Sequence, residues 1–172
     1  MTASSEKLRV SPTANGHLIR ILGRVSFRES RAFSEFVNSL LGEDGEIVVD
    51  LAECQHLDST FLGCLLMLWK LHGADESPRV RIRAEANCAK RLFGPTGLHT
   101  IIKFTDECPE PLADERDIPI PHFDMTVCGS HVLETHRSLA ESAKVGAEQF
   151  SKVASQVEAD LQKQTRDETR LQ

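Results

Sequence analysis

The sequence has no hydrophobic run long enough to cross a membrane. Its longest apolar stretch, Phe61 to Trp69, has nine residues, whereas a membrane-spanning helix needs roughly 20. The first residues, Met1 to Lys7, are polar and contain no apolar core of a signal peptide. We therefore expect a cytoplasmic protein that does not insert into a membrane.

Paired cysteines and basic clusters are also lacking. The five cysteines are scattered and form no C-x-x-C pair, a pattern typical of reduced thiols in a cytosol. The formal net charge is −6 and no basic patch is evident, which argues against nucleic acid as the main partner. Neither a glycine-rich phosphate loop nor a nucleophile elbow is present. The sequence therefore predicts neither an enzyme nor a bound cofactor.

One group of residues could be considered as metal ligands. Cys128 and His131 form a C-x-x-H pair, with His122 and His136 nearby. A structural metal site needs a second pair at useful spacing, and none follows. We therefore predict no metal site here.

The sequence does contain alternating strand and helix signals. His17 to Val25 and Arg79 to Ala84 alternate between apolar and polar residues, as half-buried strands do, and Glu46 to Leu51 is typical of a buried strand. Apolar residues spaced three and four apart indicate helices over residues 33–41 and 59–72. This order predicts an α/β domain with a mixed sheet and helices packed on it.

The predicted domain is followed by segments of different composition. We expect residues 1–7 to be a flexible N-terminus, 8–106 the α/β domain, 107–129 a proline-containing linker, 130–165 a helical extension and 166–172 a frayed tail. The extension has an apolar seam of heptad-like spacing. The seam consists of Leu133, His136, Ala140, Ala143, Ala147, Phe150, Ala154, Val157 and Leu161.

We expect the extension to be an elongated helix that mediates self-association or partner docking. Its seam must be covered by the preceding domain, by a second copy of the tail or by a foreign partner, because a lone helix of this kind is marginal. Gly146 leaves open a break into two helices.

The segment Asp58-Ser59-Thr60 stands where a loop gives way to the second predicted helix. All three residue types are good helix N-caps. A helix N-terminus tolerates a phosphate because of its unpaired N–H groups and positive dipole end. The segment can therefore be a phosphorylation site or a plain helix cap.

Two separated motifs resemble the STAS family of anti-sigma factor antagonists (anti-anti-sigma factors). The first is Ile47 to Leu51, a six-residue loop, and then Asp58-Ser59-Thr60-x-Leu62-Gly63. The second consists of Ala89-Lys90-Arg91-Leu92-Phe93, Gly97-Leu98 and Ile101-Ile102-Lys103-Phe104. The resemblance covers roughly residues 8–106.

The resemblance implies a bacterial phosphoprotein that regulates transcription by partner switching. Ser59 would be the phospho-acceptor, and Asp58, Thr60, Phe61 and Gly63 would join it in binding the partner. That partner would be an anti-sigma factor that is also a serine kinase, bound when Ser59 is unmodified and released when Ser59 is phosphorylated. A PP2C-type phosphatase would reverse the modification. We expect Ser59 to be accessible with a free hydroxyl.

Two positions depart from the family pattern. Phe61 stands where the family usually has glycine, and we expect its ring to be partly exposed as a partner contact. Gly23-Arg24-Val25-Ser26 stands where many antagonists read G-E-L-D. The alternative function is a scaffolding or sensory STAS protein. Its C-terminal helix would form a homodimer or dock a signalling partner without phosphorylation of Ser59.

Overall fold

The computed structural model describes residues 7–121 and 124–170. The strands are β1 (Leu8–Thr13), β2 (Gly16–Ile21), β3 (Gly23–Val25), β4 (Glu46–Asp50), β5 (Cys54–Leu57), β6 (Val80–Arg83), β7 (Phe104–Thr105) and β8 (Arg116–Asp117). The α-helices are α1 (Phe27–Leu41), α2 (Ser59–His72), α3 (Ala86–Phe93), α4 (Met125–Ser142) and α5 (Ala147–Arg170). Two 3-10 turns, η1 (Gly94–Thr96) and η2 (Leu98–Thr100), follow α3.

Six strands form a mixed sheet in the order β7-β6-β4-β2-β1-β8. β1 and β2 are an antiparallel hairpin, while β2, β4, β6 and β7 run parallel to one another. The β4 residues after Glu46 are buried, as expected for a central strand covered on both faces. The predicted α/β architecture with a mixed sheet is confirmed.

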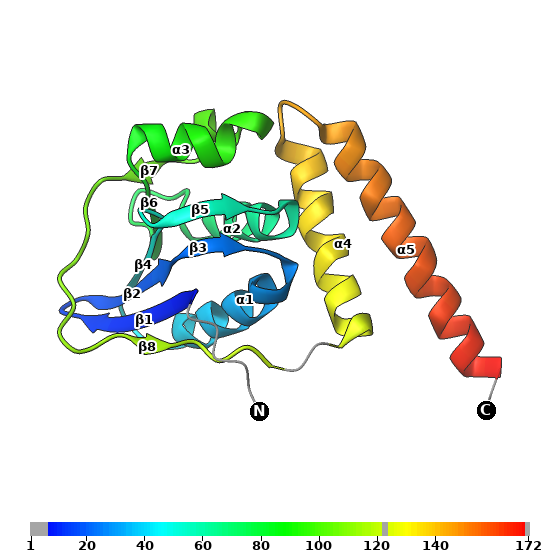
Figure 1. The fold of residues 1–172 in the computed structure, drawn as a ribbon, viewed down its shortest axis with the longest axis horizontal. Helices are drawn as coiled ribbons and strands as arrows, with labels where there is room; N and C mark the ends of the chain where they lie inside the picture. The colour runs from blue at the N-terminus through cyan, green and yellow to red at the C-terminus, as the bar shows by residue number, and fades with distance from the viewer. Residues whose placement is uncertain (1–6, 122–123, 171–172) are drawn as a thin grey trace.

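Figure 1 shows the layers of the molecule in succession: the sheet, then α1 and α2, then α4, and finally α5. α2 contacts both α1 and α4. It is therefore enclosed between the main core and the C-terminal helices. This enclosure explains why residues 60 to 66 and Leu68 of α2 are all buried, since a helix that is apolar on all sides is a buried helix.

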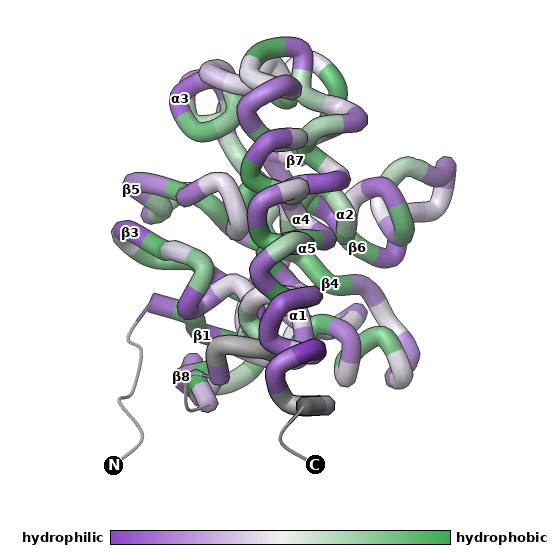
Figure 2. Tube along the Cα trace, turned by 90° about the vertical axis from the view of Figure 1, so that its right-hand side faces the viewer, coloured by the Kyte–Doolittle hydropathy of each residue, from purple (hydrophilic) through white to green (hydrophobic). Residues whose placement is uncertain are grey.

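The tail is a helical hairpin, so the single elongated helix expected over residues 130–165 is wrong. Gly146 has a positive φ of 80°, a left-handed conformation that glycine adopts without steric cost. The chain turns there, and α5 returns along α4 (Figure 1). The break at Gly146 that the sequence left open is therefore observed. α4 is covered by the preceding domain on one side and by α5 on the other. Figure 2, which looks onto the α5 side, shows that α5 carries mostly hydrophilic residues.

Two short strands lie where the sequence predicts irregular structure. β5 was expected as a loop, but it pairs parallel with β3 in a separate two-stranded sheet. Gly23, with a φ of 64°, marks where β3 leaves the line of β2. β8 lies in the expected linker and pairs antiparallel with β1, where it covers an otherwise open sheet edge. Both strands are too short to show a periodic sequence pattern.

The sequence also predicts a last strand over Ile101 to Phe104, and this prediction is only partly correct. Phe104 begins β7, whereas Ile101 and Ile102 donate backbone hydrogen bonds to Leu98 O and close the η2 turn. Ile102 is buried in the main core. Ile101 packs against the same core, so the apolar character of the pair reflects its burial and not a strand.

Candidate functional site

Asp58 joins the beginnings of two helices. It is the N-cap of α2, and its Oδ1 accepts a hydrogen bond of 2.8 Å from Phe61 N. Its second carboxylate oxygen accepts a bond of 2.7 Å from Phe27 N, at the start of α1. One side chain therefore satisfies backbone donors that helix termini leave unpaired. Asp58 has a structural role in addition to the partner contact that the sequence predicts.

Ser59 is the first residue of α2 and is half-buried. Its Oγ lies 3.0 Å from Nε2 of His136 in α4. The expectation of a free hydroxyl is therefore wrong, whereas the predicted position at the N-terminus of the helix is correct. The physical reason is that α4 packs over the N-terminal end of α2, a contact between residues 77 positions apart that no local pattern encodes.

The tautomer of His136 follows from its other contact. Nδ1 lies 2.9 Å from the backbone oxygen of Val132, which can only accept a hydrogen bond, so Nδ1 carries the proton. When Nδ1 carries the only ring proton, Nε2 is an acceptor and the Ser59 hydroxyl donates to it. On its far side the ring meets Phe150 of α5 edge-on, with 6.0 Å between centroids. His136 is thus held between the candidate phosphorylation site and the outermost helix.

The sequence places His136 in the apolar seam of the tail and does not connect it to Ser59. One signal was available: a histidine that interrupts an apolar seam needs a polar partner when it is buried. His136 is 4% exposed. The partner could not be named from the sequence because nothing local sets which face of the domain α4 covers.

Two other residues of the predicted partner surface point inward. Thr60 and Phe61 are 4% and 0% exposed. The expectation that Phe61 is a partly exposed partner contact is therefore wrong. Its ring packs on Phe33 of α1, with 5.1 Å between centroids, because α2 is buried on more sides than its predicted apolar stripe indicated.

Gly63 marks the closest approach of α2 and α4. A Cβ added to it would lie 2.5 Å from the backbone oxygen of Thr135 in α4, far inside the normal contact distance. Only glycine permits the two backbones to approach this closely. Gly63, predicted to contact a partner, contacts α4 instead.

A second histidine of α4 contacts a serine of α1. His131 Nε2 lies 2.7 Å from Ser30 Oγ, and Ser30 is fully buried. Burial lowers the pKa of His131 below its ordinary value of 6.5. The smaller electrostatic contributions come from Glu134, Arg31, Glu35 and Asp58. The neutral ring is therefore favoured in the docked helix.

This lowered pKa predicts that the folded chain is destabilised by acid. The unfolded chain binds the His131 proton at a higher pH than the folded chain, so its contribution is complete above pH 6.5 and decreases as the pH falls below that value. We expect a lower free energy of unfolding at about pH 5.5 than at about pH 8, and a smaller difference in His131→Gln. Urea unfolding at the two pH values measures this. An unchanged pH dependence in His131→Gln would assign the effect to other groups.

The cysteines near the site are buried and unreactive. Burial raises the pKa of Cys54 to about 11 and that of Cys64 to about 12, so neither thiol ionises near neutral pH. The described residues 7–121 and 124–170 contain no group of three or more histidine, cysteine, aspartate or glutamate residues that could hold a metal ion. Of the ligands considered from the sequence, His122 lies outside the described residues.

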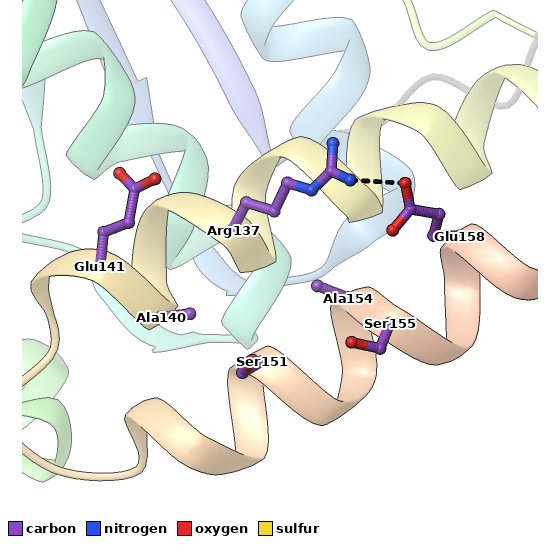
Figure 3. A pocket seen from close by; sticks show the side chains of 7 residues that line it. All are labelled: Arg137, Ala140, Glu141, Ser151, Ala154, Ser155 and Glu158. Carbon is purple, nitrogen blue, oxygen red and sulfur yellow. Dashed lines mark hydrogen bonds and ion pairs between the residues drawn. The ribbon is translucent and has the colours of Figure 1, made fainter.

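A cleft of about 300 Å³ lies between α4 and α5 (Figure 3). Its lining consists of Arg137, Ala140, Glu141, Ser151, Ala154, Ser155 and Glu158. Arg137 and Glu158 form an ion pair of 2.7 Å across it, so these two charges satisfy each other. The cleft follows from the small side chains at the seam, and the Ser59 region remains the better candidate for function.

A family model described as Mlab, STAS domain matches residues 8–103. This match covers more than half of the chain. The chain belongs to the STAS family. No curated protein matches the sequence. In the part of the chain that the structure describes, we find no helix with the length and apolar character needed to span a bilayer.

The matched STAS domain includes Ser59 and every element from β1 to η2, whereas α4 and α5 lie beyond it. The contact between Ser59 and His136 therefore joins the domain to an appended helix. The STAS domain supplies the serine, and the appended hairpin supplies the residue that holds it.

Proposed function

We propose that this protein is a protein-binding module switched by phosphorylation of Ser59. In the unmodified form it binds an anti-sigma factor that is also its serine kinase, and in the phosphorylated form it releases that partner. A PP2C-type phosphatase restores the unmodified form. The protein acts in the cytoplasm as a substrate of these enzymes and is not itself an enzyme.

One observation carries this proposal. Ser59 is the first residue of α2, and its hydroxyl is directed out of the STAS domain to an element outside it. The helix N-terminus stabilises a phosphate through its dipole and backbone N–H groups. Phosphorylation would add a charge of about −1.5 to −2 next to Asp58. This change alters a docking surface without requiring a new fold.

The proposal is tested by comparing partner capture by wild type, Ser59→Ala and Ser59→Asp. We expect wild type and Ser59→Ala to retain a GHKL-type kinase, identified by mass spectrometry. We expect Ser59→Asp to bind it at least about tenfold more weakly, because an unpaired charge at an interface costs more than 1.4 kcal/mol. Ser77→Asp is the matched control, since Ser77 is exposed in the loop beyond the opposite end of α2.

Phosphate mapping on protein purified from its own host provides the second measurement. We expect a phosphorylated peptide that contains Ser59. Equal partner capture by all three proteins, together with an unmodified Ser59, would contradict the switch. That result would favour the scaffolding function, in which the C-terminal helices dock a signalling partner or a second copy of the chain.

A further inference from the structure

α4 occupies the surface that surrounds Ser59. It contacts both α1 and α2, and it meets them at three successive points. His131 reaches Ser30 in α1, Thr135 lies against Gly63 in α2, and His136 reaches Ser59. A protein that recognised Ser59 on this face of the STAS domain would need the same space.

The contact between α4 and the STAS domain is mainly polar. Among the α4 residues whose side chains are described, the buried ones are Cys128, Thr135, His136, Ser138 and Leu139. Three of these five, Thr135, His136 and Ser138, are polar, and Leu139 is the large apolar side chain that enters the main core. Contacts of this composition resemble transient interfaces more than a permanent core.

α4 depends on docking for its helical structure. Its sequence, MTVCGSHVLETHRSLAES, contains a glycine in the second turn and several β-branched residues. Gly129 alone costs about 1 kcal/mol relative to alanine. Most helices in proteins are stabilised by packing and not by propensity, and this helix has little propensity to rely on. When its contacts with the domain are lost, α4 loses its support.

The connection between α4 and α5 is also tied to the STAS domain. The backbone N–H of Lys144 donates to Thr96 O at 2.9 Å, and its Nζ lies 2.7 Å from Thr100 Oγ1. Phe150 of α5 is packed against the main core and against His136. The docked hairpin therefore has defined contacts beyond the C-terminal end of α4 and behind His136.

The Ser59–His136 contact has no space for a phosphate. A phosphoryl group replaces the hydroxyl proton that Nε2 accepts, so the hydrogen bond disappears. Its phosphorus and three further oxygens cannot fit within a separation of 3.0 Å. With the Nδ1 proton held by Val132 O, the Nε2 lone pair that accepts from Ser59 would face the incoming negative charge.

We propose that α4 is an intramolecular occupant of the Ser59 surface, and that docking of α4 and phosphorylation of Ser59 exclude each other. The docked helix shields the Ser59 hydroxyl from a kinase. A phosphate on Ser59 releases α4, and with it the α4–α5 hairpin. The biological role of this exclusion rests on the proposed switch, in which the partner competes with α4 for the same face of the unmodified domain.

The test uses the full-length chain with phosphoserine incorporated at position 59 by amber suppression. Backbone amide hydrogen exchange is measured by mass spectrometry for the wild type and the phosphoserine-59 protein. We expect the α4 amides to exchange at least about tenfold faster in the phosphorylated protein. The amides of β4 and β6 should keep their protection, which shows that the STAS domain remains folded.

Two full-length control proteins give the exchange rates expected for a docked and for a released α4. Phosphoserine at position 77 carries the same charge in an exposed loop and should leave α4 protected. In Thr135→Arg a long side chain replaces threonine at the point where α4 packs directly on Gly63 of α2. There is no room for it in the docked helix, so this variant should release α4 without any phosphate. It provides the exchange rate of the released helix.

Unchanged or increased protection of α4 in the phosphoserine-59 protein would overturn the proposal. Increased protection would mean that His136 binds the phosphate as a cation. The experiment requires no kinase and no partner. If α4 is released but the capture experiment fails, the switch is disproved and the mutual exclusion stands. If the capture experiment succeeds but α4 stays protected, the switch stands and the mutual exclusion is disproved.

Discussion

Replacement of Phe61 by alanine is expected to lower the free energy of unfolding by about 4 kcal/mol. The ring is fully buried and packs on Phe33 with 5.1 Å between centroids. Truncation removes the buried apolar surface of the ring and leaves a cavity between α1 and α2. Urea unfolding followed by circular dichroism measures the change.

Leu71→Ala is the matched control for this variant. Leu71 belongs to the same helix but is 69% exposed, so its truncation should change the stability by less than about 0.5 kcal/mol. If Phe61→Ala were as stable as Leu71→Ala and bound its partner more weakly, Phe61 would be a surface contact after all. We expect the opposite result, in which Phe61 replaces the usual glycine of the family as a residue of the hydrophobic core.

Replacement of Asp58 by alanine is expected to cost about 2–3 kcal/mol, since it removes the cap of α2 and the acceptor for the first turn of α1 together. Both hydrogen bonds are short, at 2.8 Å and 2.7 Å. Phe61 N and Phe27 N would each lose a charged acceptor. Equilibrium unfolding in urea gives the stability, and the fraction of helix at low denaturant shows whether α1 and α2 fray.

Asp58→Asn separates the two contacts. The asparagine keeps one side-chain oxygen for Phe61 N, while its amide group cannot accept from Phe27 N. We expect roughly half of the loss seen in Asp58→Ala. If the asparagine variant were as stable as the wild type, the contact with α1 would contribute nothing and Asp58 would be an ordinary helix cap.

Short-range chemistry in the sequence was sufficient to determine the order of the main strands and helices of the domain, β2, α1, β4, α2 and β6, and the position of Ser59. The buried run in β4, the alternation in β6 and the apolar spacing in α1 are each read within one element, because they depend on the period of the backbone. The start of α2 at Ser59 follows from the capping ability of Asp58, which acts over three residues. The family motifs occupy these same segments.

The environment of Ser59 was decided by the tertiary structure alone. His136 and His131 reach serines that are 77 and 101 residues away in the sequence, and Phe61 is buried because α1 and α4 enclose α2. Such contacts depend on which face of the domain the hairpin covers, and the turn at Gly146 that allows α5 to fold back was only one of two outcomes open to the sequence. Periodicity shows that a helix has an apolar face, but the surface that covers this face is selected by packing between distant segments.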